Sequence, residues 1–314
     1  MEGAPRMDFV AARPVCGILL LFLVGSIVTR LTLLLWFALS PAFSVHASES
    51  VDLFTKSTVE VAPGVFSYGA FSARSLFVVT SEGVIVTDPV SVENAREMRE
   101  AISEVTDKPV RYVIYSHQHW DHAVGAGIFQ EEGAEIISHD NCLAHFERHP
   151  HPELITPDRT ITDSSAITLG GRTLRLMYLG PNHGDCMLIM QVEGTDVLYV
   201  NDLVTPYSVG LGFMPDYDPV EWLRTLRELE AMEGWTQFIG GHGIPVAPKS
   251  ALTQRRRYME ALMQAVRDGM ASGMRFDALY RSIELPEEFH AMRGYERHLE
   301  RAAERIYHFY TMGW

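Results

Sequence analysis

The feature that most constrains this chain is residues 117–122, which read His-Gln-His-Trp-Asp-His. Imidazoles two residues apart point the same way in an extended segment, and an aspartate and a histidine follow as the chain turns. Four metal-binding side chains can therefore converge from six consecutive residues. At this chain's residue frequencies, such a pattern arises by chance at about 10⁻³ over its length. The segment is therefore interpreted as part of a metal site.

The surrounding pattern predicts an α/β fold. A strand of buried type at residues 110–115 ends at the histidine segment, which places that segment on a loop leaving a strand. Strands at 65–68, 76–80 and 84–87 read as an antiparallel meander, and Ser91 reads as the N-cap of a helix that continues to residue 105. Later elements are predicted as a helix at 123–131, strands near 135–138, 166–169, 173–178, 187–192 and 196–200, a helix at 219–232 and a strand at 237–239. This order favours two mixed β-sheets flanked by helices over one doubly wound parallel sheet.

One segment cannot supply two catalytic metal sites, because a catalytic zinc takes three ligands from the protein. Further ligand-type residues occur where later predicted strands give way to loops. These are His183, Asp202 and His242.

The combined pattern resembles the metallo-β-lactamase superfamily over residues from about 60 to 248. The resemblance implies a four-layered αβ/βα sandwich with metals at one edge of its two mixed sheets. It implies His117, His119 and His183 as ligands of a first metal, Asp121, His122 and His242 as ligands of a second, and Asp202 as a bridge between them. Asp88 would orient a ligand imidazole from beneath the site.

Two departures from the family pattern bear on the substrate. The motif around His183 reads Asn-His-Gly-Asp where many members have Gly-His-Ser/Thr-x-Gly, and Asn201 stands where glycine is usual. Asp202 stands where the commonest type of true β-lactamase uses a zinc-bound cysteine, which disfavours lactam hydrolysis. The aspartate bridge is similar to that of lactonases, hydroxyacylglutathione hydrolases, phosphodiesterases and sulfatase-like members. The helical tail resembles that of periplasmic metallohydrolases associated with quinoprotein systems.

These residues predict a dinuclear metal-dependent hydrolase with two Zn²⁺, or with Mn²⁺ or iron in their place. Two metals that share a water lower its pKa from near 16 to about 7 and so supply a nucleophile at neutral pH. Asp121 is predicted as the catalytic residue that orients this nucleophile or shuttles its proton. A small ester, lactone or related compound is the expected substrate. The alternatives are a mononuclear iron enzyme of the persulfide dioxygenase type, a β-lactam hydrolase and a scaffold without catalysis.

The two ends of the chain differ from its middle. Residues 1–47 are read as a signal peptide that ends in Val45-His46-Ala47, with residues 15–40 as a membrane anchor in the alternative. An exported, periplasmic or secreted protein is expected in the first case. Residues 48–250 are predicted as the catalytic domain and residues 251–314 as a C-terminal helical extension.

Charge and aromatic residues limit the partners. The formal net charge is −14, and no lysine or arginine block is long enough to follow a phosphate backbone, so a small molecule is expected as substrate rather than nucleic acid. The one basic run, Arg255-Arg256-Arg257, is predicted as a solvated helix face. The aromatic loop at residues 205–217 is expected either to wall the substrate pocket or to pack against the helical tail.

Other candidate side chains are assigned structural roles. Cys142 and Cys186 are expected as two buried free thiols, with a disulfide as the alternative in an oxidising compartment. Asp185 is expected either to support a ligand or to be solvated. Four further histidines lie in a proline-containing stretch and are predicted as loop histidines rather than ligands: His139, His145, His149 and His151.

Overall fold

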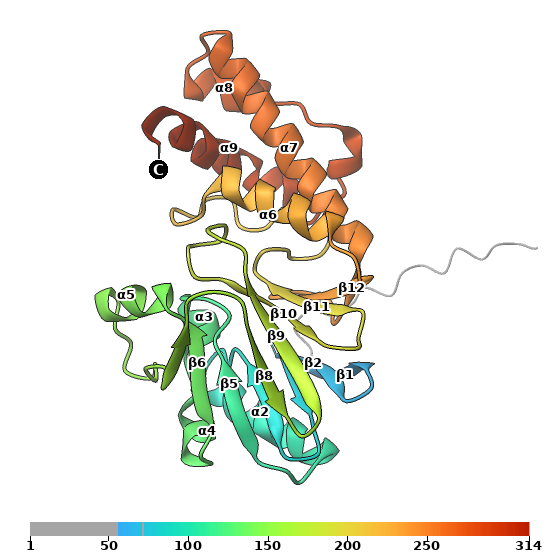
Figure 1. Cartoon of the computed structure of the whole chain (residues 1–314). Helices are drawn as coiled ribbons and strands as arrows, with labels where there is room; N and C mark the ends of the chain where they lie inside the picture. Colours follow the sequence, from blue (N-terminus) through green and yellow to red (C-terminus); the bar gives the residue numbers. More distant parts are fainter. Residues whose placement is uncertain (1–55, 71, 314) are drawn as a thin grey trace, which may run out of the picture. The chain divides into compact units, whose positions relative to one another are not determined.

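The computed structural model describes residues 56–70 and 72–313, and the described part from Lys56 onward forms one compact unit. Within these residues the strands form two sheets (Figure 1). The first sheet contains, in spatial order, β1 (Ser57–Ala62), β2 (Val65–Ala70), β3 (Ala73–Val79), β4 (Val84–Thr87), β5 (Val110–Ile114), β6 (Glu135–His139) and β7 (Arg159–Ile161). The second contains β13 (Ala247–Pro248), β12 (Gln237–Gly240), β11 (Val197–Asn201), β10 (Leu188–Val192), β9 (Arg172–Tyr178) and β8 (Ser165–Leu169).

Both sheets are mixed, as the sequence predicts. In the first sheet β1 to β4 pair antiparallel, whereas β4 to β7 pair parallel. In the second sheet β8 to β11 pair antiparallel, β11 pairs parallel with β12, and β13 returns antiparallel. The helices are α2 (Val92–Val105), α3 (Trp120–Ala123), α4 (Gly127–Glu131), α5 (Asn141–Arg148), α6 (Pro219–Ala231), α7 (Lys249–Ala271), α8 (Phe276–Ser282), the 3₁₀ turn η1 (Glu287–Phe289) and α9 (Tyr295–Met312).

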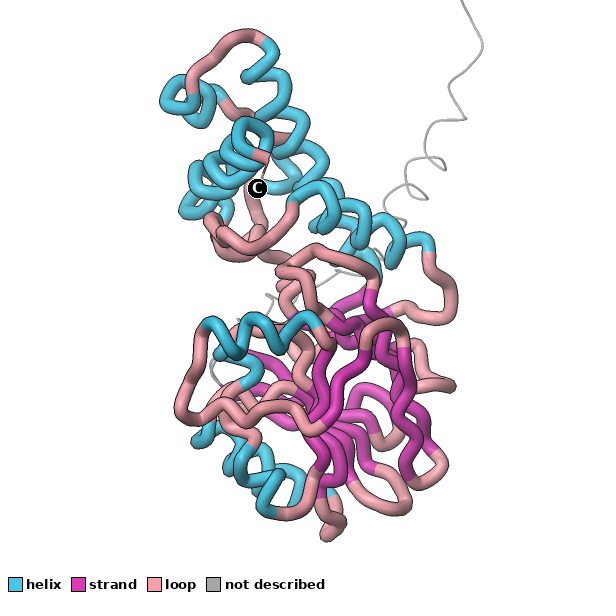
Figure 2. Tube along the Cα trace, turned by 60° about the vertical axis from the view of Figure 1, so that its left-hand side comes forward, coloured by secondary structure: helices cyan, strands magenta, loops and turns pink. Residues whose placement is uncertain are grey.

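Side chains that alternate along the strands create the layers. Leu76 and Val78 of β3 enter the core between the two sheets, whereas Phe77 enters the core between the first sheet and α2. On β10, Met190 faces the first sheet and Ile189 faces the helices beyond the second sheet. Because successive strand residues point to opposite faces, each sheet buries both of its faces. Figure 2 shows the strands lying together with the helices outside them. The predicted four-layered sandwich is confirmed.

The predicted helix at residues 123–131 is wrong as one element. It is broken into α3 and α4, and Gly125 between them has φ +101°. A β-carbon on Gly125 would overlap the backbone of Ser91, so the chain passes too close to the start of α2 to continue as a helix. Ser91 does cap α2 as predicted, since its side chain accepts a hydrogen bond from the amide of Asn94.

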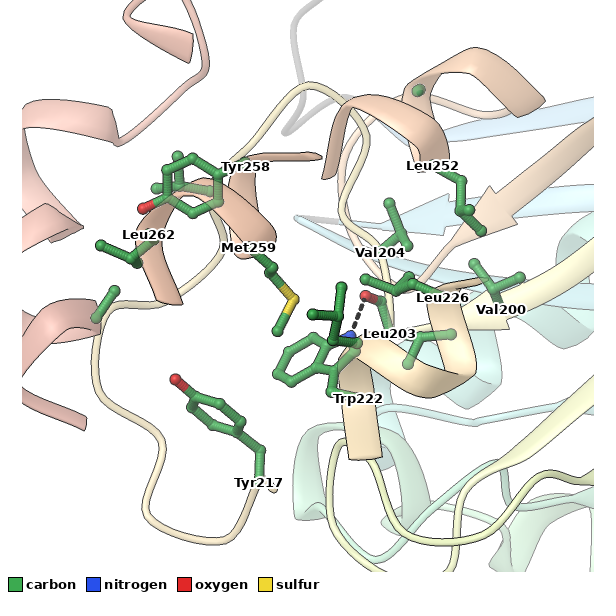
Figure 3. Close-up of a cluster of buried hydrophobic side chains, with 14 of the residues drawn as sticks. Val200, Leu203, Val204, Tyr217, Trp222, Leu226, Leu252, Tyr258, Met259 and Leu262 are labelled. Carbon is green, nitrogen blue, oxygen red and sulfur yellow. Dashed lines mark hydrogen bonds between the residues drawn. The ribbon is translucent and has the colours of Figure 1, made fainter. Parts of the chain in front are cut away.

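The helices after β13 share a hydrophobic core with the second sheet. Trp222 of the preceding helix α6 belongs to this core, donates a hydrogen bond from Nε1 to the carbonyl of Leu203 at 3.1 Å, and is nearly inaccessible to solvent. Tyr258 and Leu262 of α7 belong to the same cluster (Figure 3). The helical extension is therefore packed into the core rather than appended to it.

Residues 205–217, here called the pocket loop, are held by arginines from this extension. Arg255 of α7 is buried and donates to the carbonyl of Val209. Arg305 of α9 is also buried, and its guanidinium donates to three carbonyls of the loop, those of Met214 at 3.0 Å, Pro215 at 3.2 Å and Tyr217 at 2.6 Å. The prediction that Arg255 belongs to a solvated face is wrong, because the pocket loop supplies its hydrogen-bond acceptor.

The expectation of two free thiols is also corrected. Cys142 of α5 and Cys186 form a disulfide, and both residues are fully buried. It links α5 to the segment that carries His183, over a sequence separation of 44 residues. The predicted signal peptide or anchor within residues 1–47 lies outside the described residues. Among the described helices, none combines the length and apolar character needed to cross a bilayer.

Candidate metal centre

The structure brings the seven predicted ligand residues to one edge of the two sheets. Each of them follows the end of a strand: β5, β9, β11 or β12. Among the described residues there are two groups in which the possible ligand atoms all lie within 4.8 Å of the others in the same group. These groups are His117, His119, His183 and Asp202, here called the first group, and Asp121, His122, Asp202 and His242, the second group.

In the first group, imidazole nitrogens face each other and one carboxylate oxygen. Nε2 of His183 lies 3.1 Å from Nδ1 of His119 and 3.6 Å from Oδ2 of Asp202. Nε2 of His117 lies 3.9 Å from the same Oδ2. Trp222 packs edge-on against the ring of His183, with 5.3 Å between the ring centroids, and so fixes the position of that imidazole from the core side.

The second group uses the other oxygen of the same carboxylate. Oδ1 of Asp202 lies 3.4 Å from Nε2 of His122 and 3.2 Å from Nε2 of His242. Oδ2 of Asp121 lies 3.8 Å from Nε2 of His122 and 3.9 Å from Nε2 of His242. Asp202 therefore presents one oxygen to each group, which is the geometry of a bridging ligand.

Unpartnered nitrogens show that these residues fit metal ions. Nε2 of His117 and Nε2 of His122 are buried, and neither has a hydrogen-bond partner among the described residues. Buried polar atoms nearly always have a bonding partner, so these two nitrogens are positioned to bind a ligand such as a metal ion. Burial holds the pKa of His117 well below its usual range, which favours the neutral imidazole that binds metal. Three imidazoles with carboxylate oxygens are a donor set that suits zinc, manganese or iron.

Beneath the groups lies a buried network around Asp88. Its carboxylate accepts hydrogen bonds from the amide of Ser116 at 2.7 Å, the hydroxyl of Tyr199 at 2.5 Å and the side chain of Asn201 at 2.5 Å. The Asn201 amide also lies 3.1 Å from Nδ1 of His122, and Asp88 itself lies 4.0 Å from that nitrogen. Asp88 thus lies beneath the site, as expected, and reaches His122 through the Asn201 side chain.

The same network explains why Asn201 stands where glycine is usual. Its φ is +43°, in the left-handed region that asparagine tolerates better than most residues. Its side chain is fully buried and hydrogen-bonded to Asp88. Asparagine therefore keeps the backbone conformation and adds a polar contact beneath the site.

Gly241 makes the close approach that lets the second group form. A β-carbon at this position would overlap Oδ1 of Asp202 and would lie 2.6 Å from Oδ1 of Asn201. A Gly241→Ala variant is expected to displace the shared carboxylate and lower turnover by about 100-fold, because misplacement by about 1 Å has that cost. Metal content and turnover measure this. Gly127→Ala is the matched control, since a β-carbon there meets only Cδ1 of Ile155 at 3.9 Å. Equal activity of the two variants would contradict the argument.

Asp216 of the pocket loop is a site residue that the sequence analysis missed. Its Oδ2 lies 2.7 Å from Nε2 of His119 and 3.0 Å from the side-chain amide of Gln118. Burial would raise the pKa of Asp216, but the hydrogen bond from His119 holds it below its usual range. A carboxylate acceptor at Nε2 keeps the proton there and leaves Nδ1 of His119 free to bind a metal. The pocket loop therefore positions a candidate ligand of the first group.

Removing the Asp216 carboxylate is expected to weaken metal binding. An Asp216→Ala variant should bind the metal of the first group about 10–100-fold more weakly, as replacement of such supporting carboxylates does. Competition with a chromogenic chelator measures the affinity. Asp216→Asn keeps an oxygen that can accept the hydrogen bond, so a smaller loss is expected there. Wild-type affinity in the alanine variant would rule out the positioning role.

The remaining candidate residues lie outside both groups. His139 is buried at the end of β6 and stacks on Tyr178 with 3.8 Å between the ring centroids. His145 lies on α5 rather than on a loop, and its Nε2 pairs with Oδ1 of Asp185 at 2.7 Å. Asp185 is thus engaged by a histidine of α5 and joins neither group.

A cavity of about 1630 Å³ opens over both groups. His119, Asp121, His183, Asp202 and His242 line it, together with residues of the pocket loop and of the segment before α9. The sequence predicts that the pocket loop either lines the pocket or packs against the helical tail, and the loop does both. Residues of the loop line the cavity, and Arg305 of α9 donates hydrogen bonds to the loop backbone.

Comparisons with known proteins agree with this geometry. The family model of the Metallo-beta-lactamase superfamily matches residues 68–242, which is more than half of the chain. The alpha subunit of 2,4-dinitroanisole O-demethylase from Nocardioides sp. (strain JS1661) is 27% identical over 175 residues, covering 54% of this chain and 52% of that protein. Metallo-beta-lactamase IND-1 from Chryseobacterium indologenes is 24% identical over 182 residues, covering 57% of this chain and 75% of that protein. The chain thus spans about half the length of the first of these relatives.

A solved structure extends the likeness in fold to the helical extension. The inverting sec-alkylsulfatase Pisa1 from Pseudomonas sp. superposes with a TM-score of 0.70 and 16% sequence identity, covering 82% of this chain and 51% of that chain. The family match spans β2 to the loop after β12, and so includes all seven residues of the two groups. From its sequence match, its two mixed sheets and the residues at their edge, the chain belongs to the metallo-beta-lactamase superfamily.

Proposed function

We propose that the protein is a dinuclear metal-dependent hydrolase that cleaves a small ester or lactone, with two Zn²⁺ as the metals. The observation that carries the proposal is Asp202, whose two oxygens face different groups of imidazoles within one cavity. A carboxylate shared in this way would hold two metals close together, which a dinuclear hydrolase requires and a simple binding protein does not. Mn²⁺ or iron would fit the same donor atoms.

Bound divalent metals supply a Lewis acid and activate water at neutral pH. The chain's own residues supply the positions. Asp121 is the most exposed member of the second group, with 61% of its side chain accessible, and it lines the cavity. Its carboxylate can therefore reach a water or substrate that enters from the cavity, and orient it or accept its proton. His183 packs against Trp222 and His119 is hydrogen-bonded to Asp216, so these two imidazoles of the first group are held in position.

The substrate class comes from this chain rather than from its relatives. The names of the relatives refer to an O-demethylase, a beta-lactamase and an alkylsulfatase, so they do not agree on one substrate. An aspartate at position 202 in place of a zinc-bound cysteine disfavours a lactam. We also propose that the protein is exported, with residues 1–47 as the signal peptide or residues 15–40 as an anchor. The Cys142–Cys186 disulfide supports export, because disulfides persist in oxidising compartments.

Metal analysis combined with a substrate screen tests the proposal. Protein purified without added metal is expected to contain two equivalents of zinc and to hydrolyse aryl esters or lactones until a chelator is added. An Asp121→Ala/His122→Ala variant should lose this turnover while keeping its circular dichroism spectrum. One equivalent of iron with oxygen uptake would instead indicate a persulfide dioxygenase-type enzyme. Absence of metal-dependent turnover across lactones, β-lactams, phosphodiesters and alkyl sulfates would indicate a scaffold.

A further inference from the structure

Arg293 occupies a fixed position at the wall of the cavity. It lies between η1 and α9, where its backbone pairs with the pocket loop. Its amide donates to the carbonyl of Tyr207 at 2.9 Å, and its carbonyl accepts from the amide of Val209 at 3.1 Å and from Oγ of Ser208 at 3.1 Å. These three bonds hold the backbone of Arg293 independently of its side chain.

Arg293 lines the same cavity as Asp121, Asp202 and His242 of the second group. Nη2 is 3.8 Å from the position that a β-carbon on Gly243 would take, and Gly243 directly follows the candidate ligand His242. Burial lowers the pKa of Arg293, and no carboxylate of the described residues opposes that effect. The guanidinium groups of Arg255 and Arg305, by contrast, donate hydrogen bonds to carbonyls of the pocket loop. Arg293 therefore presents a partly desolvated cation to the cavity without a partner among residues 56–70 and 72–313.

A guanidinium in such a position is suited to a bound oxyanion. Its planar fork matches carboxylate and sulfate groups, and a charge-assisted hydrogen bond is about twice as strong as a neutral one. Four acidic residues of the described chain line the cavity. Asp121 and Asp202 face imidazoles, Asp216 faces His119, and Glu296 forms no ion pair with Arg293 within 4.0 Å. The open partner position of Arg293 thus points to negative charge on the ligand.

The rest of the cavity wall is apolar where solvent reaches it. Leu211 and Phe213 of the pocket loop are 66% and 42% exposed, and Trp120, next to the ligand residues, is 46% exposed. All three line the same cavity as Arg293. Large apolar side chains gathered in solvent around a cavity mark a ligand surface more often than chance exposure.

We propose that Arg293 binds an oxyanion of the substrate, so that the natural substrate is an amphiphilic organic anion whose apolar part lies against Leu211 and Phe213. The oxyanion is a carboxylate remote from the cleaved bond or the sulfate of a sulfate ester. That the bound anion is a substrate rests on the proposed hydrolase function. The binding of the anion itself depends only on Arg293 and the cavity wall.

Equilibrium binding of simple probes tests the inference. Octanoate, octane-1-sulfonate and neutral 1-octanol are titrated into wild-type, Arg293→Met and Arg148→Met protein by calorimetry, both with metal and after its removal. Arg148 lines the same cavity from α5, so its variant removes the same charge at another place. Wild-type protein should bind at least one anion about tenfold more tightly than octanol, and Arg293→Met should lose about that factor for the anion alone. The anion that loses more identifies the group as carboxylate or sulfate.

Three results would overturn the inference. They are equal affinities of the wild type for anions and octanol, unchanged anion affinity in Arg293→Met, and an equal loss in Arg148→Met, which would indicate a diffuse charge effect. Turnover of neutral p-nitrophenyl butanoate reports separately on the proposed hydrolase. Metal-dependent turnover without Arg293-dependent anion binding would contradict the anion site and leave the proposed hydrolase intact. Arg293-dependent anion binding without any metal-dependent turnover supports the anion site and contradicts the hydrolase.

Discussion

An Asp202→Ala variant is expected to fold but to lose about 10³-fold or more in turnover, because without metals the pKa of water returns to near 16. The reason lies in the sharing of this carboxylate. Its Oδ2 faces His117 and His183, and its Oδ1 faces His122 and His242. One substitution therefore removes a ligand from both groups, whereas loss of any single histidine affects one.

Metal content and turnover together measure this effect. Wild-type protein and an Asp185→Ala variant should retain two equivalents of metal after dialysis, and Asp202→Ala should retain less than one. Asp185 is the matched control because its carboxylate pairs with His145 and joins neither group. Two retained metals with wild-type turnover in Asp202→Ala would contradict the bridging role.

Loss of the Cys142–Cys186 disulfide is expected to have the largest effect on stability. The bond closes a loop with a sequence separation of 44 residues, and a loop of this size gives about 4 kcal/mol in the chain-entropy treatment. For a unit of this size, that corresponds to a fall of about 10 °C in the unfolding midpoint. Both cysteines are fully buried, so reductant must be added before refolding rather than to the native protein.

Thermal unfolding with and without reductant checks this expectation. Wild-type protein refolded in reductant should match a Cys142→Ser/Cys186→Ser variant, and the variant itself should not respond to reductant. A wild-type midpoint that is identical in both conditions, with the thiols of both Cys142 and Cys186 free in each, would show that the native protein lacks the bond.

The sequence predicted the sandwich because its two signals are local. Short runs of mainly apolar residues mark the main strands, and residues of the two groups follow strand ends, as His117 and Asp202 do. The missed strands β1, β7 and β13 lie at sheet edges. β7 and β13 have three and two residues, which is too short for a pattern, and β1 alternates only between partly buried and exposed residues. The sequence could therefore place the site before it could outline every strand.

What escaped prediction depends on contacts between distant segments. Asp216 lies 97 residues from its partner His119, in a loop without periodicity, so no local pattern marks it. The disulfide likewise joins positions whose distance only the fold determines. Arg255 is different, because it precedes Tyr258 by three residues and so shares the buried face of α7. That spacing could have shown that the first arginine of the run faces inward.

The contacts of the Arg305 guanidinium affect how the activity of truncated forms of this protein should be interpreted. It connects α9 to the carbonyls on both sides of Asp216, and Asp216 in turn contacts His119. A chain cut after Pro248 would lose this brace and expose the indole of Trp222. Inactivity of such a fragment would therefore be no sign that the missing helices carry a catalytic group. The separate roles of the tail are better resolved by single side chains than by deletion.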